Sequence, residues 1–126
     1  RTFEELRLKV QNLKKTPKVF IGVFGDYAIL NPRLNFAKNY FEVLGLEVDD
    51  SAVGITDLED FKKLMNSRKE DILVYCASDA DTEKLRGMNH GPVTFVAGKV
   101  EVDHCQNIFA GQDVYEVLSQ LVGKWS

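Results

Sequence analysis

The stretch Val19-Phe20-Ile21-Gly22-Val23-Phe24-Gly25-Asp26 decides the fold. It carries no polar side chain before its last residue, so apolar positions do not alternate with polar ones. A strand that is covered on both faces has this pattern, and such strands are typical of parallel sheets. In an open α/β sheet, the loop after the first strand lies over the crevice where ligands bind. Ligand chemistry is therefore expected at Asp26 and the residues that follow it.

Further apolar segments alternate with helical patterns along the rest of the chain. We predict strands over 18–24, 46–48, 72–77, 93–96 and 108–110. Helices are predicted over 3–15, 32–44, 57–67, 79–85 and 114–125. Strands and helices that alternate at this spacing indicate an α/β domain with a parallel sheet.

Helix boundaries are predicted from residues that cap or break helices. Pro32 fits the first turn of a helix, and Gly45 fits the position just after a helix ends. Ser and Thr, with an acidic residue three positions later, form capping boxes, and Asp is also a favourable N-cap. The expected N-caps are Thr2 with Glu5, Thr56 with Glu59, Ser78 with Asp81, and Asp113.

Right-handed crossovers leave few ways to arrange these elements. The simplest is the flavodoxin-like α/β fold: a five-stranded parallel sheet in the order 2-1-3-4-5, with helices on both faces. An additional helix within residues 1–16 precedes it. The connection 98–107 is shorter than the dozen residues that a parallel crossover usually needs, so we expect a loop there in place of a helix. Residues 1–126 are expected to form a single domain, cut from a longer chain because the first residue is not Met.

The composition disfavours several classes of protein. The chain has 126 residues and a formal net charge of −3, which gives no reason to expect nucleic-acid binding, because that requires a basic surface. No apolar run approaches the roughly 20 residues that span a bilayer. The two cysteines, Cys76 and Cys105, do not form a disulfide framework and suit a reducing cytoplasm. We therefore expect neither a nucleic-acid nor a membrane partner.

One string of residues is specific enough to indicate a family. The segment 35–42, Asn-Phe-Ala-Lys-Asn-Tyr-Phe-Glu, with Leu44-Gly45-Leu46-Glu47 after it, resembles the C-terminal domain of the small, non-catalytic subunit of bacterial methylmalonyl-CoA mutase. The resemblance continues through 95–99 and 110–114 and so covers nearly the whole chain. It implies the flavodoxin-like fold of a cobalamin-binding domain, in agreement with the pattern of strands and helices.

The resemblance also implies that the cofactor motifs are degenerate. Active cobalamin-binding domains carry Asp-x-His-x-x-Gly after the first strand, where the histidine ligates cobalt and the aspartate orients it. Here Asp26 matches the aspartate, but Ala28 stands where the histidine belongs. The family's Ser-x-Leu after the third strand keeps only its serine, Ser78, and its Gly-Gly after the fourth corresponds to Ala97-Gly98. These five positions are therefore expected to be a vestigial site that binds no cofactor.

Other candidate residues do not predict a catalytic or metal site. His104 and Cys105, beside Asp103, are adjacent in sequence and do not close a tetrahedral site, and His90 is distant in sequence. Cys76 lies in an apolar run and is expected to pack as a small hydrophobic residue. We predict no metal site and no catalytic residue.

The resemblance implies a non-catalytic structural domain in the small subunit, paired with the large catalytic subunit in the cytoplasm. The whole enzyme would interconvert methylmalonyl-CoA and succinyl-CoA with adenosylcobalamin. An alternative is a module that binds cobalamin or another small molecule in the same crevice without histidine ligation; Tyr27, Ile29 or Leu30 filling that crevice would argue against it. A flavodoxin or a phosphorylated receiver domain is a third possibility, although no phosphate-binding loop follows the first strand and Asp26 lacks an acidic neighbour.

Overall fold

A computed structural model describes residues 2–87 and 94–125, and its centre is a parallel sheet. The five strands are hydrogen-bonded in the order β2-β1-β3-β4-β5, which confirms the predicted topology. Their bounds are β1 Lys18–Phe24, β2 Glu47–Ile55, β3 Ile72–Ala77, β4 Thr94–Ala97 and β5 Gln106–Ile108. Val93, the first residue of the predicted fourth strand, and the turn signal His90-Gly91-Pro92 that precedes it in the sequence lie outside the described residues.

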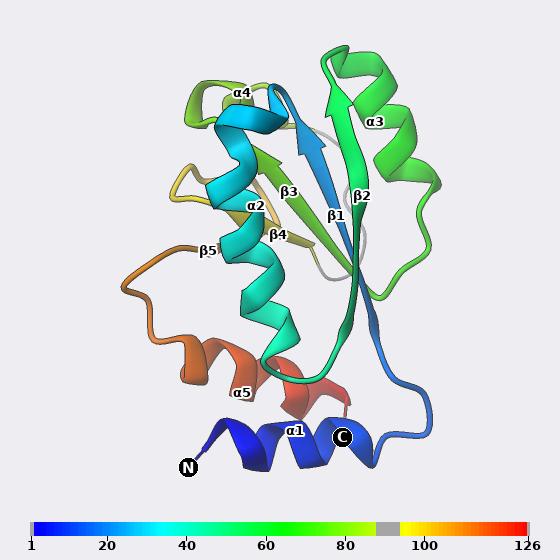
Figure 1. Cartoon of the computed structure of the whole chain (residues 1–126), viewed down its shortest axis with the longest axis vertical. Helices are drawn as coiled ribbons and strands as arrows, with labels where there is room; N and C mark the ends of the chain where they lie inside the picture. Colours follow the sequence, from blue (N-terminus) through cyan, green and yellow to red (C-terminus); the bar gives the residue numbers. More distant parts are fainter. Residues whose placement is uncertain (1, 88–93, 126) are drawn as a thin grey trace.

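Helices cover both faces of the sheet, as predicted (Figure 1). On one face, α2 packs with α5, and α1 lies beside α5 near the amino ends of the strands. The other face is covered by α3, by Leu85 after α4 and by Val102 in the connection to β5. The helices are α1 Phe3–Gln11, α2 Tyr27–Glu42, α3 Leu58–Ser67, α4 Asp79–Glu83 and α5 Val114–Trp125.

The two cores follow from the alternation of side chains along β1. Val19, Ile21 and Val23 face α2 and α5, whereas Phe20 and Phe24 face α3. Every residue of β1 after Lys18 is buried. The continuous apolar run in the sequence therefore reports a strand with helices on both sides.

Several predicted N-caps are confirmed. Thr2 Oγ1 accepts from the backbone N–H of Glu5 at 3.2 Å, and Ser78 Oγ accepts from that of Asp81 at 3.1 Å. The carboxylate of Asp113 likewise accepts from the backbone N–H of Glu116 at 3.1 Å. These short polar side chains satisfy N–H groups that the first helical turn leaves without a partner.

Two helix boundaries were predicted wrongly. The second helix begins at Tyr27, not at Pro32, because Asp26 caps it directly after β1. Pro32 lies inside the helix, so its fixed backbone angle did not mark the first turn. The first helix ends at Gln11 rather than near Lys15.

The third helix and two strands also differ from the prediction. The N-cap of α3 is Asp57, whose carboxylate accepts from the Asp60 N–H at 2.9 Å, and not Thr56. The strand predicted over 46–48 extends to Ile55, and the strand predicted over 108–110 covers 106–108. The middle of β2 is polar and partly exposed because β2 is an edge strand, so it lacks the apolar run used to find the others.

The connection from β4 to β5 contains no helix, as its length predicted. Instead, Asn107 holds it through its side-chain amide. Asn107 Nδ2 donates to the carbonyl oxygens of Gly98 at 2.9 Å and Val100 at 2.8 Å. Gln112 Nε2 donates to the Asn107 carbonyl at 2.9 Å, and the Tyr40 hydroxyl donates to Gln112 Oε1 at 2.9 Å. A chain of hydrogen bonds therefore joins α2 to the shortened connection.

Candidate functional site

The carboxyl ends of the strands bring most of the vestigial residues to one edge of the sheet. Gly25 follows β1, Ser78 follows β3 and Gly98 follows β4. A Cβ atom placed on Gly25 would lie 3.6 Å from Asp81 Oδ2, so the ends of β1 and α4 are close neighbours. In a sheet of this order, the crevice at this edge is where a ligand binds.

Asp26 and Ala28 serve the start of α2. The carboxylate of Asp26 accepts from the backbone N–H of Ala28 at 2.9 Å, and both residues are exposed. Ala28 lies in the first turn of the helix and offers only a methyl group. Asp26 therefore performs a capping role, the ordinary structural role of an acidic residue just before a helix.

Tyr27, Ile29 and Leu30 are the bulky residues that could fill the crevice, and of these three only Leu30 is buried. Leu30 Cδ1 would lie 3.2 Å from a Cβ on Gly25, and Leu30 is 6% exposed. Tyr27 and Ile29 are 46% and 73% exposed. Leu30 thus packs over the end of β1, whereas the two residues flanking Ala28 face solvent.

The residues after β3 and β4 also have structural roles. Ser78 caps α4, and its carbonyl accepts from the Thr82 hydroxyl at 2.7 Å. Ala97 is buried within β4, where it pairs with Cys76 on one side and Ile108 on the other. Gly98 adopts a φ of +124°, which side-chain-bearing residues rarely adopt.

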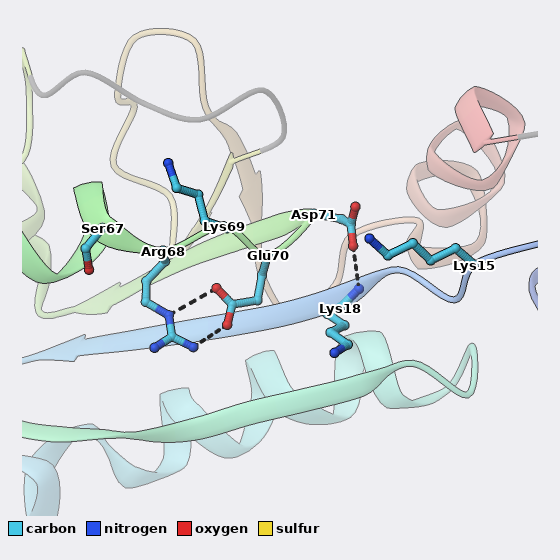
Figure 2. Close-up of a pocket in the computed structure, with 7 residues that line it drawn as sticks. All are labelled: Lys15, Lys18, Ser67, Arg68, Lys69, Glu70 and Asp71. Carbon is cyan, nitrogen blue, oxygen red and sulfur yellow. Dashed lines mark hydrogen bonds and ion pairs between the residues drawn. The ribbon is translucent and has the colours of Figure 1, made fainter.

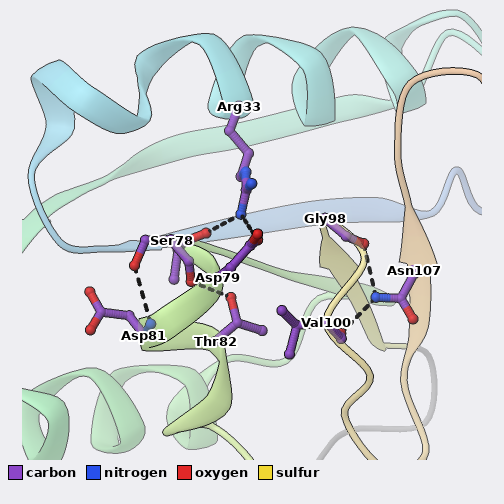
Figure 3. Close-up of polar contacts among 9 residues, drawn as sticks. Arg33, Ser78, Asp79, Asp81, Thr82, Gly98, Val100 and Asn107 are labelled. Carbon is purple, nitrogen blue, oxygen red and sulfur yellow. Dashed lines mark hydrogen bonds and ion pairs between the residues drawn. The ribbon is translucent and has the colours of Figure 1, made fainter.

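Arg33 belongs to this site, and the sequence analysis missed it (Figure 3). Its Nη1 donates to the carbonyl oxygen of Ala77 and to Asp79 Oδ1, 3.1 Å away. Figure 3 shows the side chain reaching from α2 toward the start of α4. No local pattern in the sequence marks this role: Arg33 is a cation between Leu30 and Leu34, which are buried on α2.

A groove of about 560 Å³ adjoins Arg33 between α2 and the end of β5. Its walls are mostly apolar and include Ile29, Phe36 and Phe109. Lys99 Nζ lies 5.2 Å from the centre of the Phe109 ring, in the range of a cation–π contact. The groove could take an apolar group, and Arg33 and Asp79 would be the charged groups nearest to it.

The thiols are poorly suited to nucleophilic chemistry. Cys76 is fully buried, and burial raises its pKa to about 11. The pKa of Cys105 is also raised to about 11, by burial and by the nearby Asp103 carboxylate. A protonated thiol is a weak nucleophile and a weak metal ligand. Within 2–87 and 94–125, no three His, Cys, Asp or Glu residues are grouped so that they could hold a metal ion, and His90 lies outside these ranges.

A second hollow, of about 400 Å³, lies at the opposite edge of the sheet (Figure 2). Arg68 binds Glu70 through Nε and Nη2, and the backbone N–H of Lys18 donates to Asp71 Oδ2 at 2.9 Å. Figure 2 shows the Lys18 and Lys69 side chains pointing in different directions. The cations of this hollow are therefore not gathered around one point, as binding a compact anion would require.

Comparison with known proteins gives an informative match. No family model matches the chain. Over 101 residues, 79% of its length, the chain is 32% identical to a protein of Porphyromonas gingivalis named methylmalonyl-CoA mutase small subunit. The chain spans only about 15% of that relative's length. The expected similarity to a mutase small subunit is therefore confirmed at this level.

In the described residues, no helix is both long and apolar enough to cross a membrane.

Proposed function

We propose that the chain is a degenerate cobalamin-binding domain with a structural, non-catalytic role in the small subunit of a methylmalonyl-CoA mutase. The observation that carries this proposal is the alanine at position 28. In the motif that Asp26 begins, this position is where a cobalt-ligating histidine is expected. A methyl group has no lone pair to donate to a metal.

The geometry around position 28 supports the same conclusion. The Asp26 carboxylate, which would orient a ligating imidazole, is engaged by the Ala28 backbone N–H at 2.9 Å. Helix α2 begins immediately after the cap, so the loop in which a ligand residue would stand is replaced by helical backbone. The residues at the end of β1 therefore do not fit a protein-ligated cobalamin.

Positions 97–98 and Ser78 add weaker support. Ser78 is used as a helix cap, and Gly98 packs beside the Arg33 guanidinium. Both residues that could be remnants of a cofactor site thus have contacts within the protein. Because Ser78 and Gly98 already have contacts within the protein, neither residue needs a bound cofactor as a partner.

The proposal extends to the assembly. The large catalytic subunit is the expected partner, and adenosylcobalamin-dependent interconversion of methylmalonyl-CoA and succinyl-CoA would belong to the whole enzyme, in the cytoplasm. The similarity to a protein named as a mutase small subunit supports this assignment. Pull-down of a candidate large subunit by the purified chain would test the partnership directly.

Titration with adenosylcobalamin tests the loss of cofactor binding. We expect equilibrium dialysis to detect no bound cofactor and the absorbance spectrum of the cofactor to stay that of its free form. Bound cofactor whose spectrum reports a protein nitrogen on cobalt would contradict the proposal. An Asp26→Ala variant is a useful companion, because a binding signal that depended on Asp26 would show that the aspartate is more than a cap.

The alternative function is a small-molecule module, and the apolar groove beside α2 favours it. The groove's volume of about 560 Å³ lies within the range of ligand pockets. Cofactor that binds with an unchanged cobalt coordination spectrum would support this alternative over a purely structural role. A Phe36→Ala variant would then bind more weakly, since Phe36 lines the groove.

A further inference from the structure

A cationic side chain lies within the edge of the sheet at which ligands of such folds bind. Arg33 Nη1 donates to the carbonyl oxygen of Ala77, at the carboxyl end of β3, and to Asp79 Oδ1 at the start of α4. Figure 3 shows this guanidinium between α2 and α4. One side chain thus joins a helix to the end of the neighbouring strand.

Gly98 brings a fourth segment to the same point. A Cβ on Gly98 would lie 3.1 Å from Arg33 Nη1, 3.4 Å from Arg33 Cζ and 3.5 Å from Asp79 Oδ1. The backbone after β4 therefore lies close beside the guanidinium, and a side chain at position 98 would crowd it. The ends of β3 and β4 therefore converge on Arg33, which also lines the groove of about 560 Å³ beside them.

The bond to the backbone is the stronger part of this arrangement. Asp79 has a 70% exposed side chain, so its ion pair with Arg33 is screened by solvent and contributes little. The bond to the Ala77 carbonyl is charge-assisted and partly buried, which makes it stronger than a neutral hydrogen bond. The Arg33 side chain itself is 31% exposed, so it lies at the rim of the crevice.

We propose that Arg33 is the built-in occupant of the crevice between the ends of β3 and β4. Its guanidinium takes the space directly against Ala77, Asp79 and Gly98 and fastens α2 to these strand ends, so their contacts are made without a ligand and the open groove begins beside it. This inference rests on the proposed function in treating the crevice as a former cofactor site. It adds that Arg33 is the residue that now contacts the strand ends in that former site.

A double-mutant cycle between Arg33 and Gly98 tests the contact. We expect Arg33→Ala to lower the melting temperature by about 5 °C, the effect expected from losing a charge-assisted bond in a domain of this size. Gly98→Ala should also lower it, through the strained φ and the contact with the guanidinium. In the double variant, Gly98→Ala should lower the melting temperature by less than it does alone, because the added methyl group no longer meets a guanidinium. The combined loss should therefore be smaller than the sum of the two single losses.

The controls separate this role from that of an ordinary surface arginine. Arg86→Ala removes an exposed ion pair with Glu83 and should leave the melting temperature unchanged. Asp79→Asn should cost much less than Arg33→Ala. Should Arg33→Ala fail to fold, Arg33→Lys replaces it in the cycle, since lysine keeps the charge but does not reproduce the position of Nη1. Strict additivity of Arg33 and Gly98 substitutions would overturn the inference.

The outcome is independent of the cofactor titration. Cobalamin binding by the unmodified chain, with additivity intact or not, would overturn the proposed loss of cofactor binding. If the effects of the Arg33 and Gly98 substitutions are strictly additive and no cofactor binds, only the proposed role of Arg33 is overturned. The two proposals therefore fail on different measurements.

Discussion

Gly22 in β1 lies directly against Met65 of α3. A Cβ atom on Gly22 would overlap Met65 Sδ and would lie 2.9 Å from Phe61 Cε1. Helix α3 can approach the sheet this closely because β1 has no side chain at that point. The glycine within an otherwise bulky apolar strand is thus explained by packing, since its φ is not in the positive range.

We expect Gly22→Ala to destabilise the protein by about 1–3 kcal/mol, the usual cost of overpacking a core. Gly123→Ala is the matched control, because a Cβ on Gly123 in α5 would meet no atom within 4 Å. Alanine at an interior helical position is more favourable than glycine, so this control should gain about 0.5–1 kcal/mol. Urea denaturation of both variants measures these changes, and equal effects would contradict the packing argument.

Asp26 should behave as a helix cap. Asp26→Ala removes the acceptor of the Ala28 N–H bond, and we expect a loss of about 1 kcal/mol. Asp26→Ser keeps an oxygen that can cap the helix and should retain most of the stability. Thermal denaturation distinguishes the two variants. A serine variant as unstable as the alanine variant would show that the charge of Asp26, and not its capping bond, is what matters.

Arg68 joins three segments near the amino ends of the strands. It binds Glu70, lies 3.5 Å from Asp49 Oδ2 and stacks 4.1 Å from the centre of the Phe20 ring. We expect Arg68→Ala to cost about 1–2 kcal/mol through the lost pair and the lost ring contact. Arg68→Lys should recover only part of this, because an ammonium lacks the planar fork. Urea denaturation of the two variants measures the difference, and full recovery by lysine would contradict the role of the fork.

The same pair predicts a pH dependence. The hydrogen bond from Arg68 lowers the pKa of Glu70, so the folded protein holds the ionised carboxylate more strongly than the unfolded chain does. The stabilisation is complete above the ordinary glutamate pKa of about 4.3 and is lost as the pH falls through the lower folded value. Urea denaturation from neutral to acidic pH should show a smaller decline for Arg68→Ala. An unchanged decline would contradict the assignment.

Cys76 predicts a second pH dependence, on the alkaline side. Burial raises its pKa from 9.0 to about 11, so between these values the unfolded chain loses the thiol proton while the folded chain keeps it. Stability should therefore fall across this range. The fall should be smaller in Cys76→Ala, whose other titrating groups are the same. Denaturation at pH values on both sides of 9.0, the ordinary pKa of a thiol, checks this, and identical falls in both proteins would contradict it.

The strand order was predictable because its signals are local and strong. The apolar runs at β1 and β3 have no polar interruption, and capping residues such as Ser78 and Asp113 mark where helices start. The helix boundary at Tyr27 was missed for a physical reason. Two rules competed there, a proline in the first turn and an aspartate at the cap, and the cap prevailed because its carboxylate bonds directly to the Ala28 N–H.

The candidate site was only partly predictable. Its backbone positions follow from the strand ends, so Ser78 and Gly98 could be placed at one edge of the sheet. Arg33 could not, because its role depends on contacts with Ala77 and Asp79, which lie 44 and 46 residues away in sequence. No pattern in the sequence around Arg33 reports where the third strand ends. Long-range contacts of this kind become visible only in the folded chain.

The edge strand β2 has a consequence for how the protein behaves in concentrated solution. Asp49 Oδ1 accepts both the Ser51 backbone N–H at 3.0 Å and its hydroxyl at 2.7 Å, in the stretch where the pairing of β2 with β1 shifts register. A parallel sheet that ends in a long strand would otherwise offer its outer rim to the next molecule. The register shift interrupts the regular run of backbone groups along that rim, and Asp49 adds charge to the strand, so neighbouring molecules should not join their sheets into fibrils through this strand.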